Sequence, residues 1–411
     1  MTVQYFVGID VALADHRVAV VGPDGEAVGK SFSVKANRQG LSQMTRTLSE
    51  RGAAPEHTVV GLEASGHLWE NLEASLSEQG YRVLVLNPLQ LRRFREVLRA
   101  KAKTDDLDAY LIAGLLRSGQ AQGSYLPEEH LVSLRELARL RARLMQERQD
   151  YLRRLAALLA VVFPEHRQVL GDLTTWRAQA LLQAFPTARH LAAATPHQLL
   201  KVAQEAGVRG FTVEEAEQLH RAAVESIYSG KAWQARGQVV RTLLAQIERL
   251  NASVEELDQA MQALLPPPDE GSGPSDAQLL LSIPGIGPKT AAVLVGELGD
   301  LRRFHSAKAL VAYVGFYPKI EQSGQRASPP RLCPAGSPLA RHTLYMAAVN
   351  AVRCSPQLRT LYLRKRSQGK TAKQALIVVA VKLLHIAYAL VKQRVHFHPS
   401  RLLVASEVIR P

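Results

Sequence analysis

The sequence is poor in cysteine, and this scarcity excludes two kinds of architecture. Among the 411 residues only Cys333 and Cys354 are cysteines. Two thiols cannot build a cysteine-based metal quartet, and they cannot form the disulfide framework of a small secreted domain. We therefore expect a reducing compartment, the cytoplasm.

Membrane signals are also missing. The N-terminus does not show a charged segment followed by an apolar one. The longest apolar stretch, residues 376–391, is interrupted by Lys382 and His385. We interpret this stretch as a buried helix and expect no membrane partner.

Acidic residues are scarce relative to basic ones, above all in the last third of the chain. The whole sequence has a formal net charge of +14. Residues 277–411 contain 20 Lys and Arg against 4 Asp and Glu, so they account for all of this excess. Such asymmetry favours a polyanionic partner, usually nucleic acid, along the C-terminal third. A basic surface that only maintains solubility is the alternative.

The length predicts two or three domains. In residues 1–120, helical periods lie between the later β-rich runs and after the last one, which predicts a mixed α/β sheet covered by helices. The five runs are YFVGID, HRVAVVG, SFSV, HTVVGLEA and YRVLVLNP.

Residues 121–265 are expected to form a long-helix region, with helices at 129–163 and 212–265. Leucines at near-heptad spacing in the first helix are interrupted by Arg141 and Arg148, which is compatible with a helical hairpin or an oligomerising coiled coil. Residues 266–276 are a predicted linker, and residues 277–399 a mostly helical C-terminal domain.

The segment AKTDDLDAYLIA, residues 102–113, places three acids at the start of an apolar helix. Asp105 and Asp108 share a helix face with apolar residues, whereas Asp106 lies on the other side. A favourable interaction with the helix dipole explains Asp106. The other two carboxylates face the buried side and need a cationic partner. That partner is a metal or, alternatively, a nearby Lys or Arg.

Two further acids end predicted strands. Asp10 follows Gly8 by two residues, and Glu63 follows Gly61 by two, so each acid shares a strand face with a glycine. We expect the glycine to leave empty space that a ligand could enter, although such a pattern alone is usually a turn. Four converging carboxylates would suit Mg²⁺ or Mn²⁺, and a pair of such ions supports phosphoryl transfer.

The segment LLSIPGIGPKTAAVLVGELG, residues 280–299, is typical of a helix-hairpin-helix motif. Gly285 and Gly287 would expose backbone N–H groups at a helix N-terminus, and with Lys289 they are predicted to grip phosphate. A bare helix–helix corner is the alternative. Lys289 also raises the possibility of a DNA glycosylase, but no downstream Asp lies in the required apolar context.

The order of GID, GLEASG and KTDDLDA resembles the DEDD set of a RuvC-like, ribonuclease H-like domain. Nearly the whole chain resembles the insertion sequence 110 family of bacterial transposases, which includes the Piv-type DNA invertases. The resemblance implies that the catalytic, metal-binding acids are Asp10, Glu63, Asp105 and Asp108, and that Asp106 has no such role.

The polar loop of residues 315–330 contains Ser323 followed by Gly324. A Ser-Gly pair is ordinarily a turn. The resemblance assigns the nucleophile to Ser323, after the segment GFYP, and Lys319 and Arg326 are predicted to contact nucleic acid beside it. The next turn departs from the family pattern, because it lacks the expected lysine and contains prolines.

A basic run, LRKRSQGKTAKQA, spans residues 363–375. Lys365, Lys370 and Lys373 are predicted to bind phosphates, with a solvated basic face as the alternative.

The resemblance implies a DNA transposase or recombinase of an insertion sequence that cleaves and rejoins strands through a serine–DNA intermediate. It also implies a non-coding guide RNA and a homo-oligomer, a dimer or tetramer, with composite active sites. The alternatives are a RuvC-like nuclease that uses water, and a non-catalytic nucleic-acid-binding scaffold.

Overall fold

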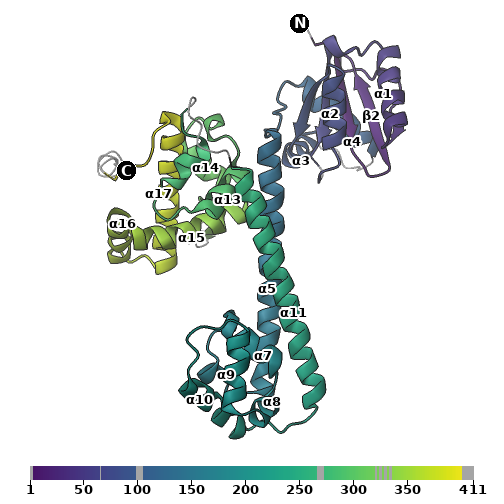
Figure 1. Cartoon of the computed structure of the whole chain (residues 1–411). Coiled ribbons are helices and arrows are strands. Elements are labelled where there is room, and N and C mark those ends of the chain that lie inside the picture. The colour runs from purple at the N-terminus through teal and green to yellow at the C-terminus, as the bar shows by residue number, and fades with distance from the viewer. Residues whose placement is uncertain are drawn as a thin grey trace. The chain divides into compact units, whose positions relative to one another are not determined.

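The computed structural model describes residues 3–64, 66–98, 105–265, 273–319, 322–323, 326–327, 331–332 and 336–399. For Asp105 and within residues 318–332 the description is limited to the backbone. The chain divides into two compact units, residues 1–126 and 127–411 (Figure 1).

The first unit is built on a five-stranded mixed sheet in the order β3-β2-β1-β4-β5. Strands β1, β4 and β5 are parallel, whereas β2 runs antiparallel to both of its neighbours. Each β-rich run of the sequence forms one strand, so the predicted mixed α/β fold is confirmed. The strands are β1 (Tyr5–Asp10), β2 (Asp15–Val21), β3 (Phe32–Lys35), β4 (Thr58–Glu63) and β5 (Arg82–Leu86).

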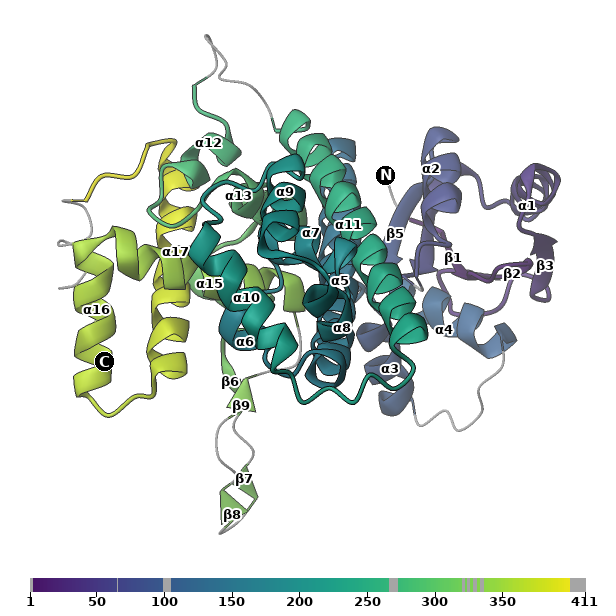
Figure 2. The ribbon, with the colours of Figure 1, turned by 60° about the horizontal axis from the view of Figure 1, so that its bottom comes forward.

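Helices cover both faces of this sheet (Figure 2). On one face, α1 (Arg38–Glu50) and α2 (Glu70–Glu78) bury Met44, Leu48 and Leu76 against the strands. On the other face, α4 (Asp105–Arg117) buries Ile112 and Leu116. Helix α3 (Pro88–Val97) packs beside α4, and a short 3-10 helix, η1 (Pro55–His57), precedes β4.

Glycines on β1 and β4 let α4 approach the sheet closely. A Cβ atom on Gly8 would lie 2.0 Å from the carbonyl oxygen of Ala109 and 2.6 Å from the nitrogen of Ala113. A Cβ atom on Gly61 would lie 2.7 Å from Cγ2 of Ile112. The expectation that these glycines leave room for a ligand was wrong, because α4 fills the space with its backbone at Gly8 and with apolar side chains at Gly61.

The second unit is organised along two long helices, α5 (Glu129–Val162) and α11 (Trp233–Ala263), which pack against each other. The two arginines that interrupt the leucine pattern have partners on α11. Arg141 Nε lies 2.5 Å from Asp258 Oδ1, and Arg148 donates to Asn251 Oδ1 at 3.0 Å. The structure therefore contains the helical hairpin, and an oligomerising coiled coil stays a prediction.

The predicted long helix at 212–265 was wrong in its extent. Residues 225–232 separate α10 (Val213–Val224) from α11. Glu165 stabilises this non-helical segment, because its carboxylate accepts hydrogen bonds from Ser226 Oγ at 2.7 Å and from the Ile227 backbone N–H at 3.2 Å. Helix α10 joins a small bundle with α6 (His166–Val169), α7 (Trp176–Ala184), α8 (Ala188–Ala193) and α9 (Pro196–Glu205).

The last helices share one apolar core with the N-terminal half of α5. Helix α17 (Ala372–Gln393) is long and apolar enough to span a membrane by length and composition alone, but half of its apolar window is buried in the protein. This burial agrees with the predicted core helix. The elements are α12 (Asp276–Leu281), α13 (Pro288–Leu298), η2 (Leu301–Arg303), α14 (Ala307–Val314), β6 (Pro318–Lys319), β7 (Gln322–Ser323), β8 (Arg326–Ala327), β9 (Arg331–Leu332), α15 (Pro338–Cys354), α16 (Pro356–Ser367) and α17 (Ala372–Gln393).

We expect Gly8→Ala to destabilise the first unit by about 1–3 kcal/mol, because the added methyl group overpacks a helix–sheet contact made of backbone. Gly114→Ala on α4 is the matched control. Its Cβ meets only Phe94 at an ordinary 3.6 Å, and alanine favours helix. Hydrogen exchange of the β1 and β4 amides in the full chain measures the effect. Equal protection in the two variants would contradict the packing argument.

Candidate active site

The two strand-end acids lie next to each other. In the parallel β1–β4 ladder Gly8 pairs with Gly61 and Ile9 with Leu62, so the next residue on each strand places Asp10 beside Glu63. Each acid shares a strand face with the glycine two residues earlier. Asp10 and Glu63, both half-buried, therefore project from the face that α4 covers.

The start of α4 reaches the same edge of the sheet. Asp106 in its first turn pairs with Arg17, and Arg17 lies opposite Asp10 in the β1–β2 ladder. Asp108 is 8% exposed, whereas Asp106 is exposed, as the helix-face argument predicted. The fold thus brings Asp10, Glu63 and Asp108 to one edge. For Asp105 only the helical backbone is described.

Asp106 ties α4 to the sheet. Its carboxylate accepts hydrogen bonds from Arg17 and, at 2.8 Å, from Ser31 Oγ. The hydrogen bond from Arg17, followed by that from Ser31, lowers the pKa of Asp106 below its ordinary value. The carboxylate therefore stays ionised and anchors the first turn of the helix, a role that we had assigned to the helix dipole alone.

Asp108 has a cationic partner on the neighbouring helix. Arg95 of α3 donates a hydrogen bond to its Oδ1, and both side chains are largely shielded from water. This contact matches the alternative of an arginine partner. The sequence did not single out Arg95, because α3 carries several arginines and only packing selects one of them. Among the described side chains, which exclude Asp105, no three His, Cys, Asp or Glu are grouped closely enough to hold a metal ion.

The predicted phosphate-binding turn lies between α12 and α13, and its two glycines differ. Gly285 has a φ of +89°, and its Cβ would lie 2.5 Å from the Ala351 nitrogen on α15, so it serves packing and backbone conformation. Gly287 precedes α13, and a Cβ there would meet no atom within 4 Å. Only Gly287 therefore leaves open space beside the helix N-terminus.

Lys289 connects this turn to the helical hairpin. Its Nζ lies 2.5 Å from Oδ2 of Asp258, which is also the partner of Arg141. Burial by itself would raise the pKa of Asp258, but the hydrogen bonds from Arg141 and Lys289 outweigh it and lower the pKa. Lys289 thus has a structural partner that the sequence did not reveal, although its side chain stays 58% exposed.

The predicted loop that carries Ser323 contains short strands. In the β7–β8 ladder Ser323 lies opposite Arg326, and in the β6–β9 ladder Lys319 lies opposite Arg331. Gly324 lies outside the described residues. The backbone of Ser323 is therefore in a strand next to the end of a hairpin, where we had expected an irregular loop.

The basic run surrounds the connection between α16 and α17. Lys370 and Lys373 are exposed, and Lys365 donates a hydrogen bond to Gln368 Oε1 at 2.9 Å. Lys370 and Lys373 are thus accessible to a polyanion.

Comparisons with known proteins bear on both units. Residues 7–164 match a family model described as transposase, and residues 277–363 match one described as transposase IS116/IS110/IS902 family. The chain is 28% identical over 406 residues to the mini-circle putative transposase for IS117 of Streptomyces coelicolor, and the match covers 96% of each chain.

A second relative is the pilin gene-inverting protein of Moraxella bovis, 24% identical over 393 residues, or 94% of this chain and 96% of that protein. A third is the uncharacterized 43.6 kDa protein of insertion element IS110 from Streptomyces coelicolor, 24% identical over 408 residues. These matches span both units, and they show that the chain belongs to the IS110 family of DNA transposases and recombinases.

Proposed function

We propose that this transposase cleaves and rejoins DNA through Ser323, at a phosphate activated by divalent metal bound to Asp10, Glu63, Asp105 and Asp108. The main support is the adjacent placement of Asp10 and Glu63 at the edge where α4 begins. Neighbouring strand ends that serve only as turns would not need two carboxylates side by side, since like charges that lie close together disfavour each other's ionised form.

The proposed ligands offer only oxygen donors, which are the donors that a hard divalent cation such as Mg²⁺ or Mn²⁺ prefers. When bound, the metal supplies positive charge that stabilises the phosphate undergoing substitution. Because Arg95 pairs with Asp108, this carboxylate would have to release the arginine in order to hold a metal ion. Arg17 would keep the start of α4 in place through Asp106.

Ser323 supplies the nucleophile in this scheme. Its hydroxyl oxygen forms a bond to the scissile phosphorus, and the bond from phosphorus to the 3′ oxygen breaks. The proton lost by serine is balanced by the proton gained by the 3′-hydroxyl. One phosphodiester replaces another, so the strand can be rejoined without ATP. The positive charges of Lys319 and Arg326 suit the charge that develops on the phosphate.

The basic C-terminal third is proposed to hold nucleic acid through Gly287, Lys365, Lys370 and Lys373. Its 20 basic against 4 acidic residues give more positive charge than a short DNA site requires, so we infer that a non-coding guide RNA binds as well. A homo-oligomer, a dimer or tetramer, completes the proposal.

Asp10→Asn, Glu63→Gln and Asp108→Asn should each reduce cleavage of element-end DNA below detection in Mg²⁺, because each removes a charged metal ligand. Asp106→Asn is the matched control, since it lies in the same helix but is bound to Arg17. Cleavage is measured on labelled DNA. Loss of activity in Asp106→Asn equal to that in Asp108→Asn, with both proteins folded, would refute the assignment.

Ser323→Ala should bind DNA normally but form no covalent protein–DNA adduct and no recombinant product, because water cannot replace the serine linkage. Ser328→Ala, a nearby serine that precedes a proline, is the control. Denaturing gels with labelled DNA detect the adduct. Strand cleavage that persists in Ser323→Ala would instead favour a nuclease that uses water.

Purified protein should carry an RNA transcribed from the flanking element, and removal of this RNA should abolish recombination. Sequencing of co-purified nucleic acid identifies the RNA, and recombination is assayed before and after ribonuclease treatment. Full activity of RNA-free protein would argue against RNA guidance.

A further inference from the structure

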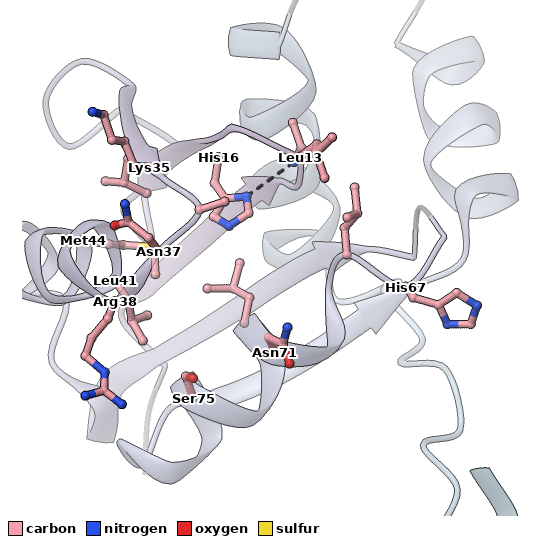
Figure 3. Close-up of a pocket in the computed structure, with 15 residues that line it drawn as sticks. Leu13, His16, Lys35, Asn37, Arg38, Leu41, Met44, His67, Asn71 and Ser75 are labelled. Carbon is pink, nitrogen blue, oxygen red and sulfur yellow. Dashed lines mark hydrogen bonds between the residues drawn. The ribbon is translucent and has the colours of Figure 1, made fainter. Parts of the chain in front are cut away.

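A cavity of about 480 Å³ lies between α1, α2 and the turn that follows β1 (Figure 3). Its volume is within the range of small-molecule sites. The acids do not line it, because they project from the sheet face covered by α4. Ala12 and Leu13 do line it, and Ala12 follows Asp10 by only two residues, or about 7 Å of extended chain. The cavity therefore begins close to the acidic edge.

The cavity combines an apolar floor with a polar rim. Met44 and Leu72 are buried and Leu41 is half-buried, and together they present aliphatic surface. Asn71 and Ser75 line it from α2 (Figure 3). Such a site suits a flat ring with apolar faces and hydrogen-bonding edges.

Two further polar groups of the cavity have defined orientations. The His16 ring accepts a hydrogen bond at Nδ1 from the Ala12 backbone N–H at 3.4 Å, which leaves Nε2 as a donor. Burial lowers the pKa of His16, so the ring is neutral near pH 7, although Asp15 opposes the shift. Asn37 uses its Oδ1 to cap α1 at Gly40, 2.9 Å away, which leaves its amide N–H₂ available.

Two basic side chains also line the cavity. They belong to Lys35 and Arg38, and both residues are exposed. Among the residues that the structure describes, neither side chain has an ion-pair partner, and no carboxylate lines the cavity. A ligand with a ring and a negatively charged group would satisfy every part of this lining.

We propose that this cavity receives the nucleobase of one DNA nucleotide that leaves the duplex beside the scissile phosphate. The inference rests on the proposed function, since strand exchange requires unpaired bases at the point of cleavage. Leu41, Met44 and Leu72 would contact the faces of the base, while Asn71 and His16 bind its edge. Lys35 and Arg38 would hold the adjoining phosphate.

Filling the cavity tests this proposal. Ser75→Trp should reduce cleavage of intact element-end DNA at least tenfold, because the indole occupies the place of the base. Activity should return when one abasic nucleotide replaces the extruded one, at a single position next to the cleavage point. Ser77→Trp is the control on the same helix, since Ser77 is exposed and does not line the cavity. Normal cleavage by Ser75→Trp, or rescue at no position, would overturn the proposal.

A second measurement does not depend on cleavage or on a substituted protein. The wild-type chain is photo-crosslinked to single-stranded DNA containing 5-iododeoxyuridine, and the adduct is mapped by mass spectrometry. Crosslinks at His16 or Met44 would support the cavity as a base site. Crosslinks only at other residues, or equal crosslinking at these residues by the matching RNA, would overturn it. A wild-type chain that crosslinks here but cleaves no DNA would refute the proposed function alone.

Discussion

The close contact of α4 with β1 and β4 determines where the candidate active site forms. This contact is possible only because Gly8 and Gly61 have no side chains, so that the backbone of α4 lies against Gly8 and its Ile112 and Leu116 side chains lie against Gly61. A helix held farther away would carry Asp108 away from Asp10 and Glu63. The glycines therefore influence the site through packing. Each glycine precedes an acid of the site by two residues and allows α4 to lie close to the strand that carries this acid.

Arginines compensate the acids that this contact gathers. Arg17 binds Asp106 and fixes the first turn of α4, while Arg95 binds Asp108. A carboxylate that is buried without a partner destabilises the fold, so the arginines stabilise the acidic edge. Their roles differ, because Asp106 has a purely structural partner in our scheme, whereas Asp108 must exchange its partner to become a ligand.

A similar charge cluster, centred on a buried carboxylate, lies in the second unit. Asp258 on α11 accepts hydrogen bonds from Arg141 of the other long helix and from Lys289 in the first turn of α13. Three segments far apart in sequence therefore meet at one carboxylate, and the predicted phosphate-binding turn is attached to the hairpin. Removal of Asp258 would leave two cations beside each other, so this acid supports the packing of α13 against the two long helices.

The sequence by itself determined the strands, the long first helix, the buried face of α4 and the family. These features depend on local periodicity and on motif order, which are written along the chain. Only the tertiary structure decided that Gly8 and Gly61 contact a helix, that Arg95 and Arg17 are the partners of the acids, and that Lys289 is bound to Asp258. Each of these contacts joins residues from separate elements. Packing selects one arginine or glycine among many, and this selection cannot be read from a one-dimensional pattern.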